Sequence, residues 1–257
     1  MISFRTAETT ATRRRLAVGL VAMAVLATAS PLMAGPADRL RDGLARGRPA
    51  DADDPPLARY VSEQGRVFVL DRTQNAALLK FEDSPEVWAL APSPAPRGDV
   101  IYKNDLGQPV LRATRLGGYT LFAGARPGGE AVSMAGGGAP LRLAPMSPQA
   151  VFERLAQSSL RASRAARRPM YFEAEATPAS SALIADAAIL ASLAIVRMAQ
   201  GPEGRAALAR FSRVRFAAGK TVEADLKDGV LSIVVAPQAG MAGRPSSEKI
   251  LRAAQER

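Results

Sequence analysis

The sequence predicts an α+β protein on three observations. Short runs with strand character recur between turn residues through residues 58–145, two long helical patterns follow, and further strand-like runs precede a last helix. We therefore expect an N-terminal antiparallel β-sheet or partly open barrel. A helical pair with a three-stranded antiparallel meander and a C-terminal helix should follow it.

The 257 residues divide into four segments by composition. Residues 1–34 have the pattern of a signal peptide, and residues 35–57 are polar with Pro and Gly at both ends, as in a flexible leader. A β-rich domain should occupy 58–145 and an α+β domain 146–257. The length of the mature chain suffices for one large domain or two small ones with a proper core.

The signal segment shows its three regions in the usual order. Residues 13–15 are all Arg, and residues 16–27 form an apolar run of 12 residues. That run is shorter than the roughly 20 residues that cross a bilayer core. Small residues then allow cleavage after Ala34, or less readily after Ala29. The Arg cluster is compatible with export by either the general or the twin-arginine route. We expect a periplasmic or secreted protein with no transmembrane anchor once the signal is removed.

Composition excludes several classes of enzyme. The chain has no Cys and no His, which removes disulfides, thiolate and histidine metal sites, and Ser-His-Asp or Cys-His catalysis. We expect no cofactor and no metal. The formal net charge is +10, with most of the basic excess of the mature chain in its C-terminal half. This charge favours an anionic partner, although we expect no nucleic acid.

The β-rich region is predicted from eight runs between turns such as Asn104-Asp105-Leu106-Gly107 and Gly117-Gly118. Alternation of apolar and polar residues is clear only near Arg112, so strand number and register stay open. The expected strands lie at 66–70, 76–81, 86–91, 99–102, 110–114, 119–122 and, more weakly, 131–134 and 141–143.

The first helix should run from Pro148 to Arg168, with Ser147 as its N-cap and Pro169 as its stop. At 100° per residue, two neighbouring faces emerge. One is apolar or small and comprises Val151, Phe152, Leu155, Ser159, Ala162 and Ala166; the other is basic and comprises Arg154, Arg161, Arg164 and Arg168. The second helix, 181–200, is apolar nearly all round and should form the centre of the C-terminal core.

The rest of the chain predicts a short helical turn at 203–209 and strands at 213–217, 221–226 and 230–236. Asp228-Gly229 is typical of a type I′ hairpin turn between the last two. A loop follows at 240–245, and a final helix, 246–255, should be capped by Ser246.

The basic face of the first helix is the main candidate binding site. Arg154, Arg161, Arg164 and Arg168 would meet lipid headgroups, lipopolysaccharide or peptidoglycan, and Arg244, beside the N-terminus of the last helix, suggests a smaller anion site. The favoured function is a non-enzymatic binding or envelope-associated module. The alternative is a structural or assembly protein that acts through a periplasmic protein partner.

A third, remote alternative is a serine hydrolase. Ser246 and Lys249 have the spacing of the Ser-Xaa-Xaa-Lys motif, in which one helical turn brings the amine beside the nucleophile. However, only eight residues follow Lys249, too few for the later elements of such enzymes. A helix cap explains Ser246 better.

Residues 81–118, with Phe68-Val69-Leu70-Asp71-Arg72 before them and Gly243-Arg244-Pro245-Ser246-Ser247 near the end, resemble a known family. It is a family of uncharacterised exported proteins of alphaproteobacteria, classed only as a domain of unknown function. The resemblance implies export and covers most of the mature chain. It implies no reaction, ligand or catalytic residue.

Overall fold

The computed structural model describes residues 55–123 and 126–256. The predicted signal segment, its cleavage point at Ala34 and nearly all of the predicted leader lie outside this range. Within it, buried apolar residues form two clusters, one in a β-barrel and one in an α+β part. Both belong to one compact unit of the chain.

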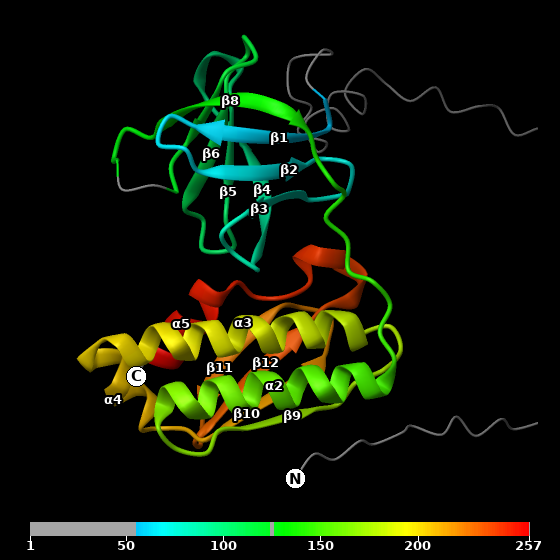
Figure 1. Ribbon diagram of the computed structural model, residues 1–257, viewed down its shortest axis with the longest axis vertical. Coiled ribbons are helices and arrows are strands. Elements are labelled where there is room, and N and C mark those ends of the chain that lie inside the picture. Colours follow the sequence, from blue (N-terminus) through cyan, green and yellow to red (C-terminus); the bar gives the residue numbers. More distant parts are fainter. Residues whose placement is uncertain (1–54, 124–125, 257) are drawn as a thin grey trace, which may run out of the picture. The chain divides into compact units, whose positions relative to one another are not determined.

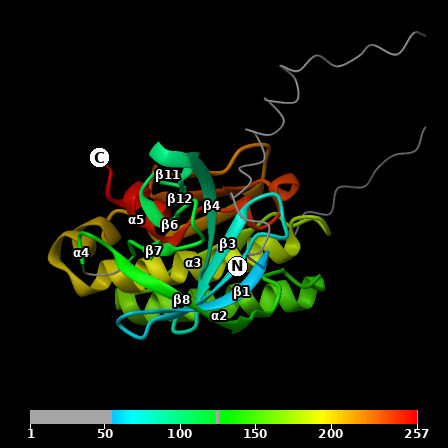
Figure 2. The ribbon, with the colours of Figure 1, turned by 90° about the horizontal axis from the view of Figure 1, so that it is seen from above.

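The barrel consists of eight antiparallel strands in sequence order, closed by pairing of the first with the last. β1 and β8 lie side by side in both ribbon views (Figures 1 and 2). A short 3-10 turn, η1 (Pro96–Gly98), separates the fourth and fifth strands. The strands are β1 (Leu57–Ser62), β2 (Val67–Asp71), β3 (Ala77–Phe81), β4 (Val87–Pro94), β5 (Val100–Lys103), β6 (Pro109–Ala113), β7 (Tyr119–Leu121) and β8 (Glu130–Gly137).

Aromatic side chains fill much of the barrel interior. Tyr60 stacks on Phe68 with ring centroids 5.5 Å apart, and Phe68 meets the edge of Phe81 at 5.8 Å. Tyr119 also packs against Tyr60, with ring centroids 5.1 Å apart. Such large rings bury much apolar area with few side-chain torsions to fix, so they suit a small closed barrel.

The predicted α+β class is confirmed, and the first seven expected strands correspond to β2 to β8. Two details differ. The sheet is closed rather than partly open, because residues 57–62 form a further strand that pairs with both β2 and β8. Residues 141–143 are not a strand, since they belong to the connection that leaves the barrel.

This connection is fastened to the barrel by Asp71. Its buried carboxylate accepts hydrogen bonds from the backbone and hydroxyl of Thr73 at 2.9 and 2.6 Å, and from the backbone N–H of Leu141 at 2.9 Å. Gln74 donates to the carbonyl of Leu141 at 2.7 Å. Burial opposes ionisation of Asp71, but the hydrogen bonds from Thr73, Leu141 and Gln74 outweigh it and lower its pKa.

The α+β part packs helices on one mixed sheet of strand order β11-β12-β10-β9. α2 and α3 run side by side (Figure 1). The elements are α2 (Pro148–Ala166), β9 (Tyr171–Ala174), α3 (Ser181–Gln200), α4 (Pro202–Leu208), β10 (Arg213–Ala218), β11 (Glu223–Lys227), β12 (Val230–Val235), η2 (Pro237–Ala242) and α5 (Ser247–Gln255).

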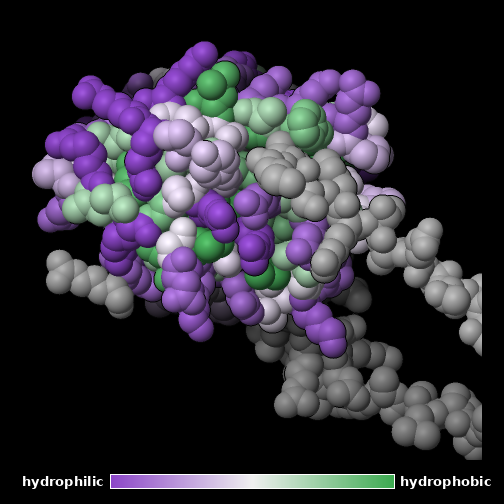
Figure 3. Space-filling view, turned by 90° about the horizontal axis from the view of Figure 1, so that it is seen from below, coloured by the Kyte–Doolittle hydropathy of each residue, from purple (hydrophilic) through white to green (hydrophobic). Residues whose placement is uncertain are grey.

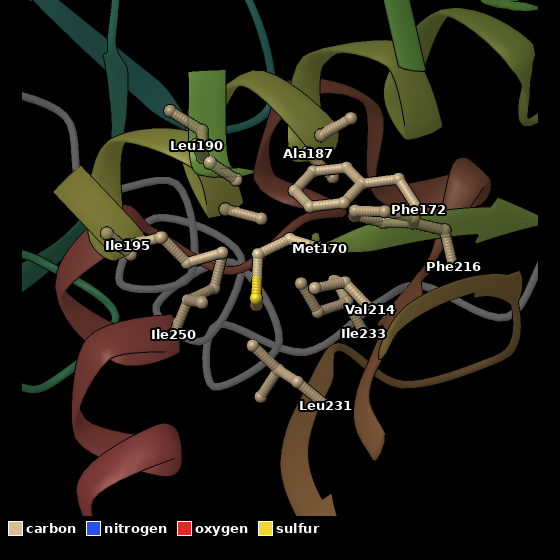
Figure 4. Packing of buried hydrophobic residues seen from close by; sticks show 14 of the residues in the cluster. Met170, Phe172, Ala187, Leu190, Ile195, Val214, Phe216, Leu231, Ile233 and Ile250 are labelled. Carbon is tan, nitrogen blue, oxygen red and sulfur yellow. The ribbon is translucent and has the colours of Figure 1, made fainter. Parts of the chain in front are cut away.

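The core of this part lies between the sheet and α3. Figure 4 shows Phe172 from β9, Phe216 from β10 and Ile233 from β12 facing Leu190 and other residues of α3. Ile250 brings α5 into the same cluster. α3 is long and apolar enough to cross a membrane by length and composition, yet most of its side chains are buried in this core, as the sequence predicted.

The predicted antiparallel meander is wrong in one respect. The Asp228-Gly229 hairpin between β11 and β12 is present, with positive φ at both residues. However, β10 runs parallel to β12 and to β9, a four-residue strand that the sequence analysis missed. The burial pattern explains the order of the strands in this sheet. None of the residues of β11 is buried, so this strand suits the sheet edge, whereas β12 buries alternate residues and takes a central place.

Candidate functional site

The predicted helix α2 begins after Ser147, whose hydroxyl accepts from the N–H of Ala150. It ends at Ala166, and Arg167 adopts the left-handed conformation that terminates a helix. The buried face of α2 comprises Val151, Leu155, Ser158 and Ala162. Phe152, which the helical spacing assigned to the apolar face, is 44% exposed because it lies beside rather than on the buried face.

Three of the four predicted arginines share the solvent side of α2. Arg154, Arg161 and Arg164 are exposed, and Arg161 donates to the hydroxyl of Ser192 at 3.2 Å. Among the described residues, none of the three forms an ion pair. Leu160, 52% exposed, adjoins Arg161 and Arg164. Seen from below, the molecule presents mainly hydrophilic side chains with small separate apolar areas (Figure 3).

Arg168, the fourth, has a partly structural role. Its guanidinium donates to the backbone carbonyls of Leu208 and Phe211, at the end of α4. With Arg167 and Arg205 it also lines a hollow of about 490 Å³, and no carboxylate is among the described residues that line this hollow. Basic side chains near helix C-termini are favoured by the helix dipole, which explains part of this clustering.

The second site of interest is the junction of the barrel with α5. Glu86, 2% exposed, accepts from the backbone N–H of Ser247 at 2.9 Å and from its hydroxyl. Arg197, in the last turn of α3, donates to the hydroxyl of Ser247 at 2.8 Å and pairs with Glu86 at 3.4 Å. Asp105, in the β5–β6 turn, accepts from the N–H and hydroxyl of Ser246 at 2.8 and 2.7 Å.

Two carboxylates of the barrel therefore cap α5. The unpaired N–H groups at a helix N-terminus favour negative charge, and here Glu86 and Asp105 supply it. The anion that the sequence analysis expected near this helix is thus provided from within the chain.

Arg244 is drawn into the same junction rather than exposed to solvent. It is 4% exposed, pairs with Asp186 of α3 and donates to the carbonyl of Val87 at 2.8 Å. A buried guanidinium needs such partners, since an unpaired buried charge is costly. Arg244 therefore joins α3 to the start of β4, and an external anion would have to displace Asp186.

The candidate serine nucleophile does not have the arrangement that the chemistry requires. The hydroxyl of Ser246 accepts from the N–H of Lys249 at 3.0 Å, as a helix cap does, and donates to Asp105. The Lys249 amine donates instead to the carbonyl of Val222 at 3.3 Å. The amine thus bonds away from the hydroxyl that it would have to deprotonate.

A cavity of about 680 Å³ opens beside the junction. Its lining combines apolar residues of the barrel with polar residues of both parts. The apolar lining includes Trp88, Leu90, Val110 and Phe122, and the charged lining comprises Glu86, Lys103, Asp105, Arg197, Arg244 and Glu248.

Most of the charged lining is paired within the chain. Arg197 pairs with Glu86 and Glu248, and Arg244 pairs with Asp186. Lys103 differs, because no hydrogen bond or ion pair to its amine is found among the described residues. This cavity cannot be recognised from the sequence, since its walls come from segments far apart in the chain. Arg244 and Ser246, which line it, were candidates from the sequence for other reasons. Trp88 packs edge-on against Phe81 at 5.9 Å.

No set of three or more acidic residues within the described ranges is arranged to hold a metal ion. No curated protein and no solved structure is significantly similar to the chain. A family model described as a domain of unknown function, DUF4908, matches residues 39–254. This match spans both the barrel and the α+β part, so the chain belongs to the DUF4908 family.

Proposed function

We propose that the protein is an exported, non-enzymatic binding module that docks on an anionic phospholipid surface through α2. The observation that carries the proposal is the set of exposed arginines Arg154, Arg161 and Arg164, which have no carboxylate partner in the described chain. Glu153 lies nearby but its carboxylate accepts from Gln149. The helix therefore offers an excess of uncompensated positive charge.

Two neighbouring features support a lipid surface as the partner. Leu160 is exposed beside Arg161 and Arg164, and an apolar side chain beside basic ones is typical of helices that lie at a membrane interface. The hollow lined by Arg167, Arg168 and Arg205 has the charge to accept a headgroup phosphate. Each basic residue near an anionic surface contributes about 1 kcal/mol.

The test is binding of the mature protein to vesicles of phosphatidylglycerol and phosphatidylcholine at low salt. The variant Arg154→Gln/Arg161→Gln/Arg164→Gln should lower the partition coefficient by roughly 100-fold, about 3 kcal/mol for three charges. The matched control is Arg115→Gln/Arg142→Gln/Arg252→Gln, which removes equal charge from exposed positions elsewhere. The control should bind almost as well as the parent.

Equal loss in both variants would mean that only net charge matters, and α2 would then not be the docking face. Equal binding to pure phosphatidylcholine vesicles would exclude the anionic surface. Circular dichroism of each variant checks that α2 is intact.

Export has its own test. The chain isolated from the envelope fraction of the cells that make it should begin at Gly35, as judged by mass spectrometry of its N-terminal peptide. An intact chain confined to the cytoplasmic fraction would contradict export without bearing on lipid binding.

A further inference from the structure

The cavity beside α5 contains an unpaired stretch of strand edge. β4 changes its neighbour along its length: residues 87–90 pair with β3, and residues 91–94 pair with β5. β5 ends at Lys103, where a register shift against β6 follows Tyr102. Such irregularities bend the chain, and the β5–β6 turn diverges from the first half of β4. The edge of β4 that faces this gap has no neighbouring strand.

The direction of the backbone groups on this edge follows from pairing on both sides of β4. Successive residues of a strand direct their N–H and C=O groups to opposite sides. The N–H of Ala95 donates to Asp99 at 2.9 Å, so Ala95, Ala91 and Ala89 direct their backbone groups toward the β5 side.

The pairing of β2, β3 and β4 leads to the same assignment. The N–H of Glu82 donates to Val67 of β2 at 3.0 Å. Alternate residues of β3, including Leu79, therefore direct their backbone N–H and C=O groups toward β4. Trp88, the partner of Leu79, directs its own toward β3. Ala89 then faces away from β3, into the gap.

The backbone N–H and C=O of Ala89, which face the gap, lie in a suitable setting for a ligand. Ala89 lines the cavity, beyond the last residue pair of β4 with β5. The carbonyl of Val87, on the same edge, is already held by Arg244 at 2.8 Å. Trp88, Val110 and Phe122 form an apolar wall of the cavity. Lys103 adds a positive charge with no partner in the described chain.

We propose that this cavity binds a short extended peptide that carries a carboxylate. The peptide adds to β4 at Ala89, giving one hydrogen bond to its N–H and one to its C=O. Its alternate side chains contact the apolar wall, and its carboxylate pairs with Lys103. Strand addition to an open edge is a general mode of peptide recognition, in which backbone bonds give affinity and pockets give specificity. A cavity of about 680 Å³ has the size of a small-ligand site and holds a few residues.

The proposal predicts a pattern that only strand pairing produces. The probe is the peptide acetyl-Leu-Ala-Leu-Ala-Glu-amide, titrated into the mature protein. Two further peptides carry N-methyl groups on one or the other set of alternate amides. Because a paired strand turns only alternate amides to its neighbour, one methylated peptide should bind at least tenfold more weakly and the other about as well as the parent.

Protein variants test the two ends of the site. Ala89→Pro removes the N–H that points into the gap and keeps the hydrogen bonds between β3 and β4. An edge strand tolerates Pro at a position of this kind. The variant should weaken binding at least tenfold. Lys103→Met should weaken the parent peptide but not a Gln-ended analogue, and Lys227→Met, exposed on β11 outside the cavity, should change neither.

Amide hydrogen exchange gives a readout that does not depend on the variants. The N–H of Ala89 should exchange rapidly in the free protein and slowly in the complex. Slow exchange in the free protein would mean that the chain itself occupies this edge, which would overturn the proposal. No binding at millimolar peptide, or equal binding of both methylated peptides, would also overturn it, even if Ala89→Pro failed to fold.

Discussion

The carboxylate of Glu86 caps α5 through Ser247: it accepts from the backbone N–H of Ser247 at 2.9 Å and from its hydroxyl. Glu86 precedes β4 of the barrel, whereas Ser247 opens the last helix. The apolar residues of the two parts form separate clusters. Buried polar contacts such as this one therefore contribute much of the specific attachment between barrel and helix.

Replacing Glu86 by Ala should lower the free energy of unfolding by about 1–3 kcal/mol, since two buried donors of Ser247 lose their acceptor. Urea denaturation measures the change. Asp83→Ala is the control, because Asp83 is exposed three residues earlier and should leave the midpoint nearly unchanged. A stable Glu86→Ala protein would show that solvent or another side chain readily replaces the carboxylate.

Local features of the fold could be predicted because their causes are local. Ser147 and Ser246 cap helices through N–H groups three residues ahead, and Asp228-Gly229 supplies the positive φ angles of its own turn. The closure of the barrel and the place of β10 depend on pairing between distant segments. No periodicity within one segment records those pairings.

The same distinction applies to the candidate sites. The arginines of α2 could be found from helical spacing, because a helix face is a local property. The partners of Arg244 could not, since Asp186 and Val87 lie 58 and 157 residues away. The open edge at Ala89 could not be found either, because it requires knowing where β5 stops pairing with β4.

The buried pair of Arg244 and Asp186 should behave as a unit. Arg244→Met leaves the carboxylate of Asp186 without its partner. The free energy of unfolding should fall by about 3–5 kcal/mol. Asp186→Asn should also destabilise. The double variant should cost clearly less than the sum of the two single changes, because the uncompensated charges are then absent. Additive losses in a double-mutant cycle, measured by urea denaturation, would argue against direct coupling.

Asp99 should make the stability of the barrel depend on pH. The hydrogen bond from Arg112, 2.8 Å from its Nε, lowers the pKa of Asp99 below the ordinary aspartate range, with help from the N–H of Arg115. A carboxyl whose pKa is lower folded than unfolded stabilises the fold fully above its unfolded pKa, about 3.9. That contribution is lost as the pH falls toward the folded pKa.

The corresponding measurement is the melting temperature between pH 7 and pH 2. Asp99→Asn should be less stable than the parent at pH 7, and the difference should shrink below about pH 4. Asp83→Asn, an exposed change in the same region, serves as the control. A difference that stayed constant to pH 2 would show that the charge of Asp99 does not contribute.

Gly243 should not tolerate a side chain. A Cβ at this position would lie 2.0 Å from the carbonyl oxygen of Ala236 and 3.0 Å from that of Gly240. Both contacts are to backbone, which cannot move aside as a side-chain tip can. The loop also carries Arg244, so displacement of Gly243 would pull the guanidinium away from Asp186 and Val87.

We therefore expect Gly243→Ala to destabilise by about 1–3 kcal/mol through overpacking, with a further loss from the disturbed Arg244 contacts. Gly137→Ala is the matched change, since no atom lies within 4 Å of its Cβ position and its φ is not positive. Thermal denaturation of both variants gives the comparison. If Gly243→Ala adds nothing to the destabilisation of an Arg244→Met protein, the whole effect passes through Arg244; an added loss measures the steric conflict itself.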